Sequence, residues 1–188
     1  MTEQSLDRER AWNLLCDWVE SDNLRKHALG VEAAMRAYAK DFGGDAELWG
    51  ITGLLHDMDY ERYPTPEDHP YRGVEALRAL GYPEVMLEAI LGHATYSGVE
   101  RTTPLAKALF AVDELSGFVV AVALVRPSKR VADVNVKSVK KKLKEKSFAK
   151  GCNREEIAQG ATELGLELDD HIARVIAALS EVAPELGV

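Results

Sequence analysis

The segment GLLHDMD occupies residues 53–59 and holds a histidine followed directly by an aspartate, His56-Asp57. Apolar residues recur at helical spacing ahead of this pair, at Leu48 and Ile51 and then in the two leucines of the segment. The pattern predicts a helix whose last turn is packed in the core. A histidine and an aspartate at the end of such a helix would be held rigidly, side by side, at the edge of the core.

Helical periodicity extends over the rest of the chain and predicts an all-α fold. Apolar residues from Leu24 to Phe42 share one helix face, and the glycines at 43–44 end that helix. A second long helix is expected from Pro104 to a stop at Pro127. Shorter helices are expected at residues 71–80, after Pro83 and in the C-terminal third, around the proline-rich loop 60–70 and stops near Gly151 and Gly165. The only candidate strand is the short stretch from Val131 to Val136.

Length and composition favour one soluble domain. The chain has 188 residues, of which 46% are hydrophobic and 29% charged, with a formal net charge of −8. These values exclude a disordered chain, a collagen-like chain and a disulfide scaffold, and an acidic chain is poorly suited to sequence-independent nucleic-acid binding. The two cysteines, Cys16 and Cys152, are expected to be reduced thiols.

No secretory signal or membrane span is expected. The N-terminus has no basic stretch leading into an apolar core, and the longest apolar run, Phe118–Val125, is far shorter than the ~20 residues that span a bilayer. We therefore expect a soluble, cytoplasmic protein with no membrane partner.

One segment departs from the acidic average. Seven lysines and one glutamate between Lys137 and Lys150 give this stretch a charge of +6, so the rest of the chain carries −14. The segment is either a solvated helix face, or a rim that steers phosphate or docks an acidic partner. The acidic remainder argues against a specific nucleic-acid partner.

Four of the five histidines occupy helix termini or tight loops where they could share a site, at His27, His56, His69 and His93. Asp113 lies in an overwhelmingly apolar helix, where a carboxylate without a partner would cost several kcal/mol, roughly, so a cation or a metal should accompany it. The fifth histidine, His171, is expected at the surface of the last amphipathic helix.

A divalent metal is the economical partner for these groups. Imidazoles and carboxylates suit iron or manganese first, and magnesium, zinc, cobalt and nickel are compatible. The absence of nearby cysteines argues against a structural zinc site. Six such groups exceed what one metal needs from a protein, and they would suit two metals roughly 3.5–4 Å apart that share a carboxylate.

The ordered set His27, His56-Asp57 and Asp113 resembles the HD superfamily of metal-dependent phosphohydrolases, an all-helical fold. The resemblance covers about residues 20–130, and residues 131–188 would form a C-terminal helical extension of the same single domain. The further histidines His69 and His93 resemble the subset with a dinuclear centre, such as bacterial diadenosine-tetraphosphate hydrolases and HD-GYP phosphodiesterases.

The resemblance implies roles for these residues. His27, His56, Asp57 and Asp113 would hold one metal, and Asp57 would bridge to a second metal held by His69 and His93. Two departures limit the comparison. Residues 58–60 read Met-Asp-Tyr where the familiar motif continues Ile-Gly-Lys, and the GYP letters at residues 81–83 are a helix stop followed by a helix start.

Outside the ligand set, Arg101 is a candidate to clamp a substrate phosphate, because it lies in the polar loop that follows His93. Asp59 and Glu61 are candidates to orient ligands or to add one, and Lys107 is left unassigned. The resemblance implies a hydrolase of a phosphate ester or anhydride, with a small nucleotide as the expected substrate. The alternative is a non-catalytic HD-fold module that regulates or binds a ligand.

Overall fold

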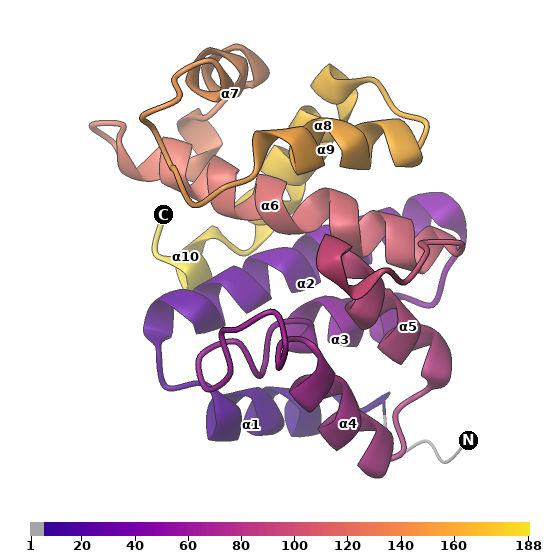
Figure 1. Ribbon diagram of the computed structural model, residues 1–188. Coiled ribbons are helices and arrows are strands. Elements are labelled where there is room, and N and C mark those ends of the chain that lie inside the picture. The colour runs from indigo at the N-terminus through magenta and orange to yellow at the C-terminus, as the bar shows by residue number, and fades with distance from the viewer. Residues whose placement is uncertain (1–5) are drawn as a thin grey trace.

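The computed structural model describes residues 6–188, and every regular element in that range is helical (Figure 1). The all-α prediction is therefore confirmed. The elements in chain order are α1 Arg8–Trp18, α2 Asp22–Phe42, α3 Ala46–Leu55, α4 Tyr71–Ala79, α5 Glu84–His93, η2 Thr95–Ser97, α6 Pro104–Leu124, η3 Val131–Asp133, α7 Val136–Leu143, α8 Arg154–Glu163, α9 Leu168–Glu181 and α10 Ala183–Leu186.

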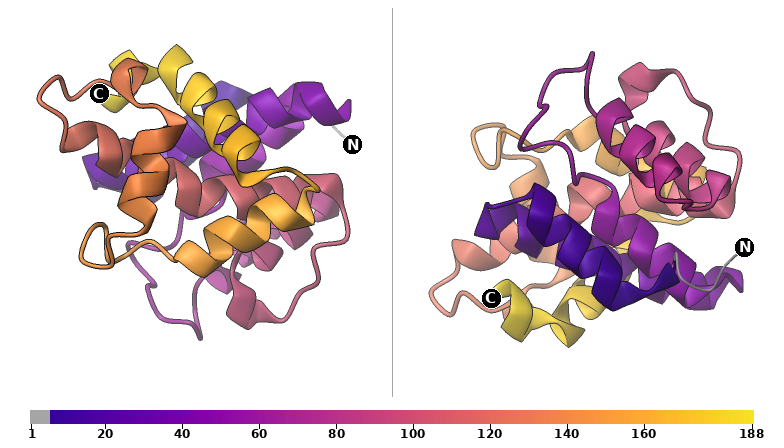
Figure 2. Two further views of the ribbon diagram at one scale, coloured as in Figure 1. Left: turned by 90° about the horizontal axis from the view of Figure 1, so that it is seen from above. Right: turned by 90° about the horizontal axis from the view of Figure 1, so that it is seen from below.

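Two 21-residue helices, α2 and α6, form the centre of the molecule. In Figure 1, α6 crosses the middle, with α1, α3 and α4 below it and α7 to α9 above it. The α2 helix packs against α3, α6 and α9, and α6 packs in addition against α5 and α8. Seen from above, the orange and yellow C-terminal helices lie in front of this pair, and seen from below the indigo α1 helix lies in front (Figure 2).

Local sequence signals define the ends of both central helices. The Ser21 side chain accepts a hydrogen bond from the Leu24 amide at the start of α2, and Gly43 ends the helix in a left-handed conformation with φ of 65°. Thr103 caps α6 in the same way, and Pro104 occupies its first turn. These boundaries agree with those expected from the sequence.

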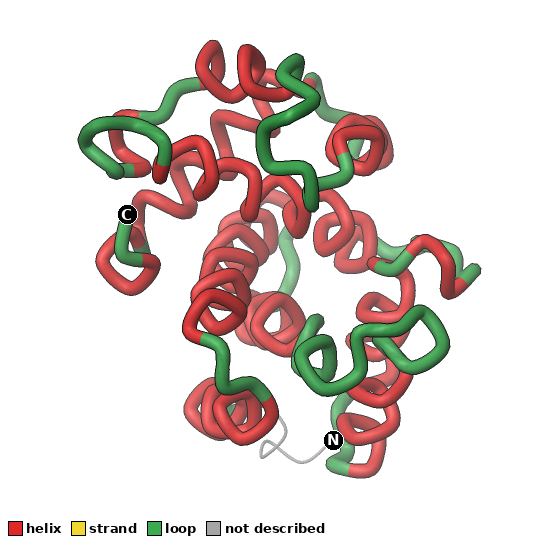
Figure 3. Tube along the Cα trace, turned by 60° about the vertical axis from the view of Figure 1, so that its left-hand side comes forward, coloured by secondary structure: helices red, strands yellow, loops and turns green. Residues whose placement is uncertain are grey.

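The buried end of α3 anchors the GLLHDMD segment. Leu54, Leu55 and Met58 are fully buried, so the backbone on both sides of the His56-Asp57 pair is held in the core. After this point the chain runs through the long loop to α4, which Figure 3 shows as non-helical tube. That loop carries His69 back towards the core.

The prediction of a strand at Val131–Val136 is wrong. Val131–Asp133 forms a single 3₁₀ turn, and α7 begins at Val136 behind an Asn135 cap. The buried valines, Val131 and Val134, pack individually into the core, and no other strand is present within residues 6–188 to pair with them.

The helices that follow residue 131 pack onto the central pair. The α8 helix approaches α6 closely at Gly160, where an added Cβ atom would lie 2.5 Å from Cα of Ala111, so only glycine fits there. No helix within residues 6–188 combines the length and the apolar character needed to cross a membrane.

The expectation that His171 lies at the surface is wrong. Its side chain is fully buried, Tyr38 Oη donates a hydrogen bond to its Nδ1 at 2.5 Å, and its Nε2 donates to the Ala111 carbonyl at 2.9 Å. His171 falls on the apolar face of α9 together with Val175 and Ala178, and that face packs on α2 and α6. The helical spacing of these three residues could have predicted from the sequence that His171 is buried.

Candidate metal centre

Six side chains that the sequence singles out gather at one place in the fold. They come from α2, the residues directly after α3, the end of the long loop, the last residue of α5, and the middle of α6. Three groups of potential ligand atoms, each within 4.8 Å of one another, overlap there and together comprise His27, His56, Asp57, His69, His93 and Asp113.

The two carboxylate oxygens of Asp57 face different histidines. Its Oδ2 lies 3.4 Å from Nε2 of His56, whereas its Oδ1 lies 3.4 Å from Nε2 of His69 and 3.2 Å from Nε2 of His93. Asp57 thus stands between two halves of the cluster.

Asp113 completes the half that contains His56. Its Oδ1 lies 3.0 Å from Nε2 of His27 and 3.4 Å from Nε2 of His56. The apolar surroundings of Asp113 in the sequence therefore correspond to a carboxylate that two imidazoles face.

Backbone carbonyls orient two of the histidines. Nδ1 of His56 donates to the Gly53 carbonyl at 2.8 Å, and Nδ1 of His93 donates to the Ile90 carbonyl at 2.5 Å. Each bond spans one helical turn and leaves the Nε2 lone pair directed into the cluster. This is the arrangement by which metal-ligating histidines are usually held.

Asp59 orients the third histidine. Nδ1 of His69 donates to Oδ1 of Asp59 at 2.7 Å, and the Gly73 amide donates to Oδ2 at 2.7 Å. Asp59 is fully buried. Glu61 points elsewhere, and its carboxylate accepts from the backbone amides of Glu20 and Ser21.

A family model for the HD domain matches residues 24–117, half of the chain, and the match includes all six clustered residues. The chain belongs to the HD domain family. Members of this family are generally metal-dependent phosphohydrolases. The resemblance to the HD superfamily seen in the sequence is thereby confirmed.

Two curated relatives share part of this HD domain chain. Ribonuclease Y 2 of Levilactobacillus brevis is 33% identical over 99 residues, which cover 50% of this chain and 18% of that protein. Ribonuclease Y of Chlorobium phaeovibrioides is 32% identical over 122 residues, which cover 63% of this chain and 22% of that protein. The aligned region thus spans about a fifth of the length of either relative. No solved structure matches the chain.

The charges in the HD domain cluster depend strongly on one another. Burial alone would lower the pKa of His56, but the carboxylates of Asp57 and Asp113 raise it well above its ordinary value. Burial opposes ionisation of Asp57, yet His56 and His93 hold its pKa well below the usual range. The buried carboxylates are therefore ionised and require positive charge beside them.

The donor set fits a divalent cation. Nε2 of His56 and Oδ1 of Asp57 are buried and have no hydrogen-bond partner among the described residues, although both atoms point into the cluster. Neutral imidazoles and carboxylates are borderline to hard ligands, as iron, manganese, zinc and cobalt prefer. Cys152 also lines the adjoining cavity, where burial raises the pKa of its thiol to about 11, so the thiol is protonated when no cation lies beside it.

A cavity of about 380 Å³ lies over the cluster. The described residues that line it include no lysine or arginine. They include four carboxylates, those of Asp57, Asp113, Glu114 and Glu156. Burial and the neighbouring Asp113 raise the pKa of Glu114 to about 7. Such an acidic cavity would repel a phosphate unless cations were bound in it.

Sequence reasoning missed several residues of this cavity, among them Glu114, Glu156 and Tyr96. Glu114 directly follows Asp113, and Tyr96 lies in the polar loop after His93, so proximity in the sequence could have indicated both. Glu156 arrives from α8, more than forty residues away, and only the packing of α8 on α6 brings it there.

Arg101 is not brought to the cluster. Its guanidinium donates to both carboxylate oxygens of Glu163 at 2.8 and 2.7 Å and to the Gly92 carbonyl at 2.8 Å, and it stacks on the Phe110 ring at 3.7 Å. Proximity to His93 in sequence suggested a phosphate clamp, but the side chain turns the other way. Lys107 and Arg101 line a separate surface depression with Glu163.

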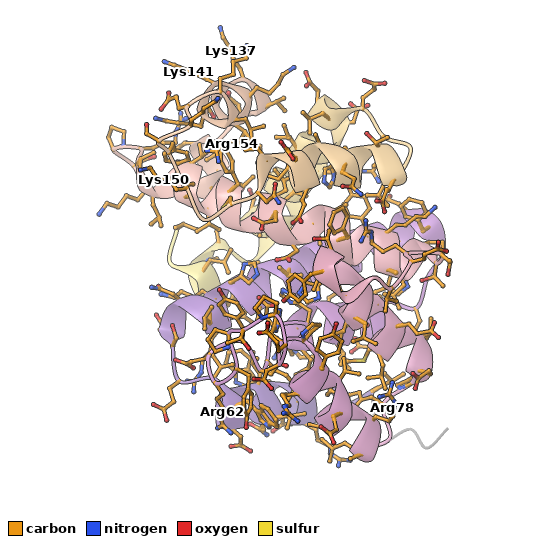
Figure 4. All side chains as sticks on the ribbon, viewed as in Figure 1. Arg62, Arg78, Lys137, Lys141, Lys150 and Arg154 are labelled. Carbon is orange, nitrogen blue, oxygen red and sulfur yellow. The ribbon has the colours of Figure 1, made fainter. Side chains whose placement is uncertain are left out.

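The lysine-rich segment forms α7 and the loop that follows it. Lys137 and Lys141 project from the top of the molecule in Figure 4. Lys140 pairs with Asp169 at 2.6 Å, and Lys142 pairs with Glu145 at 2.7 Å. None of the seven lysines lines the cavity over the cluster, so any effect on a ligand would act at long range.

Proposed function

We propose that this HD domain protein is a metal-dependent phosphohydrolase that acts on a small phosphate ester or anhydride, with a nucleotide as the expected substrate. The observation that carries this proposal is the position of Asp57, whose two oxygens face two separate sets of histidines. A carboxylate in that position suits a bridge between two metal ions.

One metal would be held by His27, His56, Asp57 and Asp113, and a second by Asp57, His69 and His93. When bound, divalent cations of this kind lower the pKa of a water molecule to supply a nucleophile and offset the negative charge of phosphoryl oxygens. Iron and manganese are the first metals to test.

The protein's own residues would bind and orient. Hydrogen bonds at Nδ1 keep His56, His69 and His93 in the tautomer that presents Nε2 to a cation. Burial and the negative charge of Asp57 raise the pKa of Tyr96 to about 12, so this hydroxyl stays protonated and is available to donate to a phosphate oxygen in the cavity.

The cavity's charge supports a requirement for cations in substrate binding. With four carboxylates and no lysine or arginine among its described lining residues, the cavity offers a phosphate no side chain of fixed positive charge, and its three histidines already face carboxylates of the cluster. Affinity for the phosphate would therefore depend on bound metal, and metal removal should abolish binding as well as turnover.

The likeness to ribonuclease Y favours a phosphodiester as a second candidate substrate class. The alternative of a non-catalytic module is less favoured, because degenerate modules usually lose ligands and this chain retains all six groups together. A screen should therefore include monoesters, anhydrides, linear and cyclic dinucleotides, and a short RNA.

The test starts with elemental analysis of the purified protein, followed by this screen with the metal found and with manganese. We expect one or two metal ions per chain and turnover that chelation removes and metal restores. The same assays on Asp57→Ala test the metal site. The matched control is Asp68→Ala, which removes an aspartate from the loop after α3 that pairs with Arg72 at 2.9 Å. A metal-loaded protein that binds phosphate esters without hydrolysing any would support the non-catalytic alternative instead.

A further inference from the structure

A second cavity adjoins the one over the metal cluster. It has a volume of about 360 Å³ and lies between α2, α6 and the chain after α10. His27 and Gly117 line both cavities, so the two are neighbours across these residues. A group bound in the second cavity would sit directly behind a proposed metal ligand.

The walls of this cavity are largely aliphatic. Val120, Ala121 and Leu124 of α6 form one side, and Leu186 and Val188 lie opposite. Gly117 has no side chain to fill the space beside α6, and an added Cβ atom would meet nothing closer than the His27 ring at 3.8 Å. Small residues of this kind leave room for a flat group to lie against the helix.

One buried polar atom of a lining residue has no partner in the described fold. Ser116 is 1% exposed, lines the cavity, and its Oγ has no hydrogen-bond partner among the described residues. A buried hydroxyl without a partner costs free energy, so native proteins rarely keep one without a role. A ligand with a hydrogen-bonding edge would satisfy it.

Polar groups also lie at the α2 side of the cavity. Asn23 and Lys26 line it, and Lys26 is held by Asp22 at 2.7 Å. The cavity therefore combines apolar walls, one buried hydroxyl, and an amide and a cation on one helix. Its volume lies at the lower end of the ~300–1,000 Å³ typical of small-molecule sites.

We propose that this second cavity binds the nucleobase-sized heteroaromatic ring of the substrate while the phosphate lies at the metal cluster. A nucleobase has apolar faces and a polar edge, which match the aliphatic walls and the Ser116 hydroxyl. An alkyl chain would leave that hydroxyl unpaired. A second phosphate would have Lys26 as the only cationic side chain among the described residues that line the cavity. The inference rests on the proposed function for the phosphate, but the ring site is testable by itself.

The first experiment measures binding of nucleosides, which lack phosphate, to the metal-free and the metal-loaded protein. Titrations of adenosine, guanosine, cytidine and uridine followed by NMR should show saturable binding of at least one. Ala121→Phe would fill the cavity and should weaken that binding at least about tenfold, as loss of a buried site predicts. The control is Ala158→Phe, which places the same ring at an exposed position of α8 outside both cavities.

Ser116→Ala is the second variant and guards against misfolding of Ala121→Phe. Because Oγ has no partner among the described residues, its removal should leave the melting temperature unchanged or slightly higher. Nucleoside binding should weaken several-fold. Unchanged nucleoside affinity in both variants, or saturable binding of decanoate in place of any nucleoside, would overturn the ring site.

The two proposals fail in different ways. If nucleosides bind and the variants weaken them while no phosphate ester is hydrolysed, the ring site stands and the hydrolase proposal fails. If nucleotides are hydrolysed with the same KM by Ala121→Phe and by the wild-type protein, the hydrolase proposal stands and the ring site fails.

Discussion

Asp57 is the residue on which both halves of the cluster depend, because its two oxygens face different histidines. We expect Asp57→Ala to lose bound metal and activity together, since its oxygens lie within 3.4 Å of histidines in both halves, whereas Asp113 approaches only His27 and His56 that closely. The buried leucines ahead of His56 hold this end of α3 in the core, so we expect its backbone to stay in place when the carboxylate is removed.

Metal content by elemental analysis and turnover on a substrate found in the screen check this prediction, with Asp68→Ala as control. If Asp57→Ala retains two metals per chain and near-normal turnover, the assignment of the metal centre is wrong.

Asp59 acts on the cluster through His69, and its contribution is separable from that of the ligands. Asp59→Asn keeps the size of the side chain but gives His69 Nδ1 a weaker, neutral acceptor. We expect metal affinity or activity to fall about 10- to 100-fold, the usual cost of losing such a partner. The control is Glu67→Gln, which neutralises an exposed carboxylate of the same loop. Equal metal affinity in the two variants would contradict the role assigned to Asp59.

Arg101 is expected to matter for stability rather than for substrate. Its bonds tie the loop after α5 to Glu163 of α8, and its side chain is only 11% exposed. Arg101→Ala should lower the free energy of unfolding by about 2 kcal/mol, the scale of hydrogen bonds to a charged group. Urea denaturation of Arg101→Ala, Glu163→Gln and the double variant measures the coupling; a normal stability with a raised KM would favour the phosphate clamp instead.

At the scale of elements, the attachment of α9 to the central pair depends on His171. Burial lowers its pKa, and its two hydrogen bonds require the neutral ring. Above the ordinary pKa of 6.5 both the folded and the unfolded states hold it neutral. As the pH falls below that value, the unfolded state takes up a proton that the folded state refuses, so the free energy of unfolding falls.

We therefore expect the wild-type protein to lose more stability between about pH 7.5 and about pH 5.5 than His171→Gln, which does not titrate. Urea denaturation of both proteins across this range measures the difference, and the other histidines cancel in the comparison. Parallel pH profiles would show that His171 is protonated in the folded state.

For the whole molecule, the cluster joins elements that are distant in sequence, from α2 to α6. A cation bound there stabilises the folded state by mass action, about 2.7 kcal/mol per site at a metal concentration 100-fold above Kd. For a chain of this size that corresponds to about 5–10 °C in Tm. Calorimetry with and without chelator tests this, and Asp57→Ala should show no chelator effect.

Local pattern determined much of this protein. Apolar periodicity, capping residues and the glycine and proline stops predicted the helices, because these signals act within one or two turns. The six clustered residues could also be named, since His56-Asp57 after an apolar helix end and Asp113 in an apolar helix are unusual in themselves.

The surroundings of those residues depend on how the helices pack together. Helix packing brings Glu156 of α8 to the cavity, turns Arg101 towards Glu163, and buries His171 beneath Tyr38. In each case the decisive contact joins residues far apart in the chain, and its partner is set by how whole helices pack. The direction of a long side chain follows from that packing, which periodicity along one helix does not encode.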